Sequence, residues 1–198
     1  MTLASRPVLG HVNLMMDSFL ANANANDLRA IVRATLATCP PSTTEAFKDA
    51  AAKRLQYRAS LPLPSEGLFT SSPGGFASPN ANLEEVLSTA RSLYGIGMGL
   101  ASLRKLTAVV RATLGLKWEE GGLMSDTLAV VDSDISQAVQ SAKEELGNGG
   151  EGNKTYDNAV AIKGDLDAAL KASQRDTARW GGEFPFEKAA GNVVYWKL

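Results

Sequence analysis

Two stretches of nearly the same sequence decide the fold of this chain, Leu28-Arg-Ala-Ile-Val-Arg-Ala-Thr-Leu36 and Leu106-Thr-Ala-Val-Val-Arg-Ala-Thr-Leu114. They differ only at their second and fourth residues. In both stretches apolar residues recur three and four positions apart, which is the spacing of one face of an α-helix. The pair therefore predicts two equivalent helices, produced by a duplication or by stacked helical repeats. Chance similarity between two amphipathic helices is the alternative.

The repeat and the helical spacing around it predict an all-α fold of about six helices. We expect two related αα-hairpins, each carrying one copy of the repeat. Residues 61–82 should form the loop between the hairpins, because this segment is rich in Ser and Gly and holds four prolines that exclude a regular helix. A short α-solenoid is the alternative architecture.

Changes of composition along the chain divide it into three segments. Residues 1–25 are expected to be an N-terminal extension and residues 26–179 a helical domain, which contains the loop at 61–82 and a glycine-rich hinge at 147–153. Residues 180–198 are expected to be an aromatic C-terminal tail.

Composition restricts the classes of partner. A hydrophobic content of 44% predicts a folded chain, and a net charge of −1 gives no general attraction to nucleic acid or to anionic membranes. The uncharged run near the middle, 92–103, is shorter than the ~20 residues that span a bilayer, so no membrane span is expected. Cys39 is the only cysteine, which fits a reducing intracellular compartment, and we expect the cytoplasm or nucleus rather than an organelle.

The sequence offers little chemistry for an enzyme. His11 is the only histidine, which removes the usual general base from a catalytic triad and excludes a histidine-rich metal site. Neighbouring acids such as Asp132 and Asp134 point away from each other on a helix, so we interpret the acidic pairs as solvated faces. The Gly95-x-Gly97-x-Gly99 stretch lacks the strand and the lysine of a phosphate-binding loop. We expect no catalytic residue, no metal and no cofactor.

Three arginines are candidates for binding an anion. Arg33 and Arg111 are equivalent in the two copies of the repeat, and Arg29 lies one turn before Arg33. Together they could clamp a phosphate or another anion in a pocket between the two hairpins. The alternative is that they are solvated or paired with an acidic residue of a neighbouring helix.

The strongest functional signal is aromatic. Five of the chain's thirteen aromatic residues (Phe 6, Trp 3, Tyr 4) lie in the last nineteen positions: Trp180, Phe184, Phe186, Tyr195 and Trp196. Such residues are enriched in the cores of protein interfaces, so they are the candidate contacts of an interaction surface.

These observations together predict a non-enzymatic intracellular interaction subunit or adaptor, whose partner is another protein or a second copy of the chain. A small helical enzyme or anion-binding protein, with its pocket between the hairpins, is the first alternative. A weak nucleic-acid-binding protein is the second, although its basic clusters are small and mixed with acids.

Overall fold

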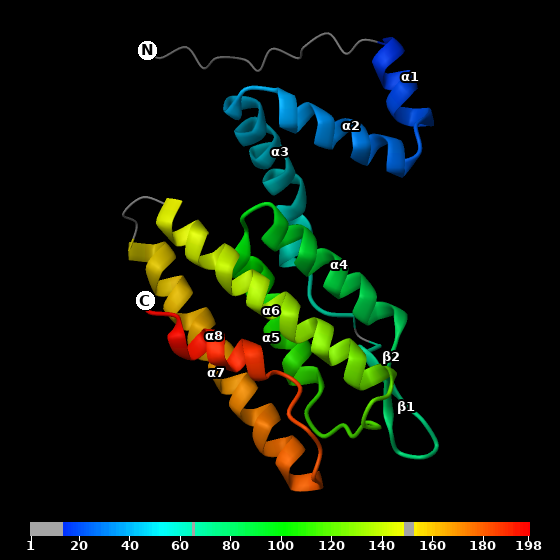
Figure 1. Ribbon diagram of the computed structural model, residues 1–198, viewed down its shortest axis with the longest axis vertical. Helices are drawn as coiled ribbons and strands as arrows, with labels where there is room; N and C mark the ends of the chain where they lie inside the picture. Colours follow the sequence, from blue (N-terminus) through cyan, green and yellow to red (C-terminus); the bar gives the residue numbers. More distant parts are fainter. Residues whose placement is uncertain (1–13, 65, 149–152) are drawn as a thin grey trace. The chain divides into compact units, whose positions relative to one another are not determined.

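The computed structural model of the chain describes residues 14–64, 66–148 and 153–198 (Figure 1). The elements in chain order are α1 (Leu14–Asn22), α2 (Ala25–Thr38), α3 (Pro41–Ser60), β1 (Phe69–Ser71), β2 (Ala77–Pro79), α4 (Ala81–Gly95), α5 (Gly99–Ala112), α6 (Leu123–Asn148), α7 (Asn153–Trp180) and α8 (Glu187–Tyr195). The described residues are thus predominantly helical, in agreement with the all-α class. They form eight helices rather than about six, because α1 lies in the expected N-terminal extension and α8 in the expected tail.

The segment at 61–82 contains a small β-hairpin that the sequence analysis did not predict. β1 and β2 pair antiparallel, with Phe69 opposite Pro79 and Ser71 opposite Ala77. Leu68 and Ala77 are buried, and the backbone N–H of Ala77 donates to the carbonyl of Lys117 at 2.7 Å. Strands of three residues are too short to show the alternation by which a strand is recognised in a sequence. The loop is therefore anchored to the core through its hairpin.

The chain divides into two compact units, and the boundary falls within α3. We call residues 1–47 the N-terminal unit and residues 48–198 the C-terminal unit. The expected segments, an extension at 1–25, a helical domain at 26–179 and a tail at 180–198, stay a prediction. Of the expected hinge at 147–153, residues 149–152 lie outside the described residues.

The core of the C-terminal unit is built around α5. This helix packs against α4, α6 and α7, and α8 packs against both α6 and α7 (Figure 1). Leu103, Leu106, Val109 and Val110 of α5 are all fully buried. The apolar residues of α5 follow helical spacing and so lie on one side of the helix, and α4, α6 and α7 together cover that side and form a single core.

The two copies of the repeat occupy different positions. The first copy lies in α2, which is followed by α3, whereas the second lies mostly in α5, which is preceded by α4. The first copy thus lies in the first helix of its pair, whereas the second copy lies in the second helix of its pair. Neither two equivalent hairpins nor a short α-solenoid is confirmed.

No helix in the described ranges 14–64, 66–148 and 153–198 combines the length and the apolar character needed to cross a membrane.

Candidate functional site

The apolar face of α2 is an exposed hydrophobic surface of the N-terminal unit. Ile31 is 44% exposed and Val32 36% exposed, and Leu28 and Leu36, on the same stripe, are half-buried. Within the part of the chain that the structure describes, no residue of α2 is buried. The preceding helix adds three more exposed apolar side chains: Met16, Phe19 and Leu20. We call the stripe Leu28, Ile31, Val32 and Leu36 the α2 face.

The α2 helix itself is well specified by its sequence. The side chain of Asn24 caps its first turn by accepting the backbone N–H groups of Asn26 and Asp27, each at 2.9 Å. An asparagine cap of this kind stabilises a helix by about 1 kcal/mol. The α2 face is therefore carried on a regular helix.

The second copy of the repeat shows how such a stripe is covered. Leu106, Val109 and Val110 in α5 have exposed fractions of 0%. The helices that cover them are α4, α6 and α7. Val109 and Val110 are thus buried by helices of the C-terminal unit, whereas their equivalents Ile31 and Val32 are exposed. The last position of the stripe differs, since Leu114 is 39% exposed and its equivalent Leu36 is half-buried.

The five aromatic candidates of the C-terminal tail do not form one exposed surface. Phe186 and Trp196 are fully buried in the core. Trp180 packs edge-on against Trp118 with 5.1 Å between ring centroids, and Phe184 packs edge-on against Phe186 at 5.9 Å.

Tyr195 is the exposed member of the aromatic set, at 81%. The burial of Phe186 and Trp196, and the partial burial of Trp180 and Phe184 against the core, explain the aromatic composition of the tail by packing. This packing therefore removes the argument that made them candidate contacts, although a contact role for them is not tested.

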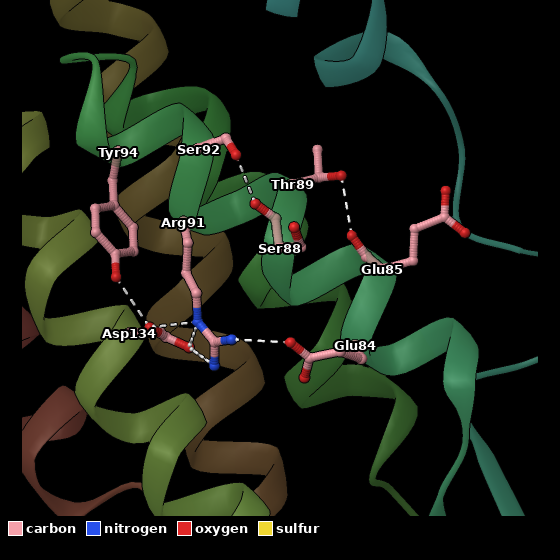
Figure 2. Close-up of polar contacts among 8 residues, drawn as sticks. All are labelled: Glu84, Glu85, Ser88, Thr89, Arg91, Ser92, Tyr94 and Asp134. Atoms are coloured by element: carbon pink, nitrogen blue, oxygen red, sulfur yellow. Dashed lines mark hydrogen bonds and ion pairs between the residues drawn. The ribbon is translucent and has the colours of Figure 1, made fainter. Parts of the chain in front are cut away.

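Asp132 and Asp134, which the sequence analysis interpreted as part of a solvated face, are both buried, so that interpretation was wrong for them. Asp134 of α6 receives Arg91 Nε at 3.0 Å and Arg91 Nη2 at 2.9 Å, and Tyr94 donates its hydroxyl to the same carboxylate at 3.0 Å. Figure 2 shows Arg91 and Tyr94 reaching from α4 to this carboxylate, while the other side of the guanidinium contacts Glu84 at 3.2 Å.

The charges of this cluster stabilise one another. The hydrogen bond that Arg91 donates to Asp134 raises the pKa of Arg91, so the guanidinium stays protonated. Burial raises the pKa of Tyr94, and the negative charge of Asp134 raises it further, so its hydroxyl stays a neutral donor. The cluster joins α4 to α6, and its donors already occupy the Asp134 carboxylate.

Asp132 and Glu145 of α6 cap the N-termini of two helices whose own N-cap residues make no side-chain hydrogen bond. Asp132 accepts the backbone N–H of Ala189 at 2.7 Å and that of Lys188 at 3.3 Å, both in the first turn of α8. Glu145 accepts the N–H of Leu100 at 2.9 Å at the start of α5. Negative charge is favourable at helix N-termini, where backbone N–H groups have no helical partner.

The capping acids are also held in a partly desolvated environment. Burial raises the pKa of both Asp132 and Glu145 above the usual range of their carboxyl groups, and the backbone N–H donors oppose this effect. The sequence signal that could have found them is the absence of Ser, Thr, Asp or Asn at the caps of α5 and α8, which are Met98 and Phe186.

The three arginine candidates fall in different units. Arg29 and Arg33 are exposed on α2, and Arg29 Nη1 donates to Asn26 Oδ1 at 2.9 Å. Arg111 lies in the C-terminal unit, where it pairs with Asp165 of α7 at 3.4 Å. Both side chains of this pair are at least half exposed, so the pair contributes little to stability. Arg111 thus has the acidic partner on a neighbouring helix that the alternative interpretation expected.

Metal ligation has no support in the residues that the structure describes, where no group of three or more His, Cys, Asp or Glu side chains could hold an ion. Comparison with known proteins gives no family model, no curated protein and no solved structure that matches this chain.

Proposed function

We propose that this chain is a non-enzymatic interaction subunit that binds the helical surface of another protein, or of a second copy, through the α2 face. The observation that carries the proposal is the contrast between the two copies of the repeat. Ile31 and Val32 are exposed on α2, whereas their equivalents Val109 and Val110 are fully buried in α5, which packs against three other helices.

The energetics of burial favour an occupant for the α2 face. Complete burial of an Ile or Val side chain contributes about 1.5–3 kcal/mol relative to exposure. Ile31 and Val32 are each more than one third exposed, so a partner that covers them gains a useful part of that energy. Arg29 and Arg33 flank the stripe, so carboxylates at the rim of the partner's groove would complement them.

The candidate contact surface differs from the one expected from the sequence. The burial of Phe186 and Trp196 favours a structural role for the tail. The surface that we propose is therefore α2, and a role of the tail in contacts is secondary to it.

The test compares two neighbouring positions of α2, one on the α2 face and one outside it. Ile31→Glu places a charge on the α2 face, and Ala30→Glu introduces the same charge about 100° away on the polar side. Light scattering coupled to size exclusion gives the mass of each full-length variant. In addition, a photo-cross-linking residue at Val32 in the cells that make the protein identifies what covers the face.

We expect an intermolecular cross-link from position 32, to a second copy or to another protein, that Ile31→Glu abolishes and Ala30→Glu leaves intact. Circular dichroism should show unchanged helicity in both variants. Cross-links only to the same chain, or intermolecular cross-links that Ile31→Glu does not reduce, would overturn the proposal.

A further inference from the structure

A cavity of about 340 Å³ lies in the C-terminal unit, where the end of α3 and the segment after it meet α4 and α5. Its lining comes from four parts of the chain: Arg58, Leu61, Pro62, Leu63, Pro64, Glu85, Val86, Thr89 and Lys105. At ~30 Å³ for each water-sized group, the cavity has room for about eleven such groups. This is the size of a small organic molecule rather than of a single ion.

The polar groups of the cavity are dominated by two cations. Arg58 Nη2 donates to the hydroxyl of Thr89 at 3.1 Å, and Thr89 donates in turn to the carbonyl of Glu85 at 3.0 Å. Lys105 Nζ donates to the carbonyl of Leu61. Each cation is thus held in place by a neutral acceptor on a different element.

Neither cation has an acidic partner among the residues that the structure describes. Burial lowers the pKa of Lys105, because its ammonium has lost water without gaining a carboxylate. An anion placed beside Arg58 and Lys105 would supply the missing charge and accept hydrogen bonds from both.

The remaining wall is mostly apolar. Leu63, Val86 and the two prolines line the cavity, and Leu63 packs against the hydrophobic core. Glu85 is the single acid of the lining, and Figure 2 shows its side chain on the side of α4 away from Asp134. The combination of an apolar wall and two cations with one opposing acid fits a ligand that has an apolar body and a single negative charge.

Two other cavities of the C-terminal unit lack this combination. The cavity of about 380 Å³ between α5 and α7 contains Arg104 and Arg111, but its one acid, Asp165, already pairs with Arg111, so only Arg104, which donates to Asn158, has no acidic partner among the described residues. The cavity of about 280 Å³ beside α8 contains the acids Asp132, Glu183 and Glu187 with one lysine, so it disfavours an anion.

We propose that the cavity between α3, α4 and α5 binds a small carboxylic acid with a short unbranched apolar chain. The carboxylate lies between Arg58 and Lys105, and the chain lies against Leu63 and Val86. This binding site is independent of the α2 face and of the proposed interaction role.

The probe is octanoate, titrated into the full-length protein by isothermal titration calorimetry. Octanol has the same chain without the charge, and acetate has the charge without the chain. Lys105→Gln and Arg58→Gln each remove one cation, Lys105→Arg keeps it, and Glu85→Gln removes the opposing acid. Lys53→Gln, on the exposed part of α3, is the matched control for net charge.

We expect octanoate to bind more tightly than either octanol or acetate. Loss of one charged hydrogen-bond donor in Lys105→Gln or Arg58→Gln should weaken octanoate binding about tenfold or more. Glu85→Gln should tighten it by up to about fivefold, because a partly exposed like charge is removed. Lys105→Arg and Lys53→Gln should bind like the parent protein.

Three results would overturn the proposal. One is no heat of binding with octanoate, and another is equal binding of octanoate and octanol. The third is unchanged affinity in both Lys105→Gln and Arg58→Gln while circular dichroism shows native helicity. Because Arg58→Gln leaves the contact of Lys105 with the Leu61 carbonyl intact, it keeps the test decisive if Lys105→Gln does not fold.

Discussion

α5 approaches the backbone of α6 closely at Gly99, and replacement of this glycine by alanine tests the packing of the two helices. A Cβ atom built on Gly99 would lie 2.2 Å from the backbone nitrogen of Ala142 and 2.6 Å from its Cα. Ordinary contacts of a Cβ atom begin at 3.4 Å, so the two helices would have to separate by about 1.2 Å (3.4 − 2.2). Rotation of a side chain cannot relieve the clash, because the opposing atoms belong to the backbone of α6.

Two effects of Gly99→Ala lower the free energy of unfolding, and one effect raises it. Overpacking in a well-packed core costs about 1–3 kcal/mol. Separation of the helices would also stretch the 2.9 Å hydrogen bond from Leu100 N–H to Glu145 beyond its useful range, at about 0.5–2 kcal/mol for a lost cap. Alanine regains at most about 1 kcal/mol of helix propensity. We therefore expect a net loss of about 1–4 kcal/mol in the free energy of unfolding.

The assay is urea unfolding of the full-length chain, followed by tryptophan fluorescence. All three tryptophans, Trp118, Trp180 and Trp196, lie in the C-terminal unit, so the signal reports on the unit that contains the clash. For a unit of this size each kcal/mol corresponds to about 2–4 °C in Tm, which a thermal melt can verify.

Gly164→Ala in α7 is the matched control for Gly99→Ala. Gly164 lies in a helix interior, and a Cβ atom there meets nothing within 4 Å. Its substitution should stabilise the protein by up to about 1 kcal/mol through helix propensity and loss of unfolded-state entropy. The reasoning is refuted if Gly99→Ala is as stable as the parent or shifts stability in the same direction as Gly164→Ala.

Three further predictions concern the acids of α6 and their partners. Asp132→Ala should cost about 1–3 kcal/mol in urea unfolding because two N–H groups of α8 lose their acceptor, and a loss no larger than that of the exposed Asp126→Ala would contradict the capping role. Burial raises the pKa of Asp132 in the folded state, so between the unfolded pKa of ~3.9 and the raised folded pKa the folded state binds a proton that the unfolded state releases. The contribution of Asp132 to the free energy of unfolding therefore increases as pH falls through this window. Asp132→Asn should abolish this component of the pH profile. Arg91→Met should cost about 1–3 kcal/mol in the free energy of unfolding, which is less than the ~3–5 kcal/mol of a fully buried pair because the Arg91 side chain is 34% exposed. Glu84→Gln should cost below ~1 kcal/mol, because the Glu84 side chain is 73% exposed. Equal effects of the two substitutions would refute the importance of the Arg91–Asp134 contact.

Helical periodicity was enough to predict the fold class, but not the roles of the polar residues. Asp132 and Asp134 lie off the main apolar stripe of their helix, and spacing alone indicates a solvated face. In the structure α6 contacts α4, α5, α7 and α8, so side chains beside the stripe also face other helices. Their burial depends on how many helices surround α6, and a local pattern contains no information on that number.

The aromatic tail shows the same limit. Its composition predicts that the tail packs against something, and the structure shows that Phe186 and Trp196 pack in the core of the same unit. An aromatic side chain is equally favourable in a core and in an interface, because both environments remove its apolar surface from water. The cavity at Arg58 and Lys105 was also beyond prediction, because four separate parts of the chain form it.

The sequence by itself determined that the segments 28–36 and 106–114 are helices with an apolar stripe, since helix propensity and periodicity are properties of adjacent residues. Only the tertiary structure decided that one stripe is buried among three helices while the other remains exposed. The physical reason is that burial is set by residues distant in the sequence, whose positions a local pattern does not specify. Two segments that are nearly the same in sequence can therefore lie in a core helix in one unit and in an exposed helix in the other.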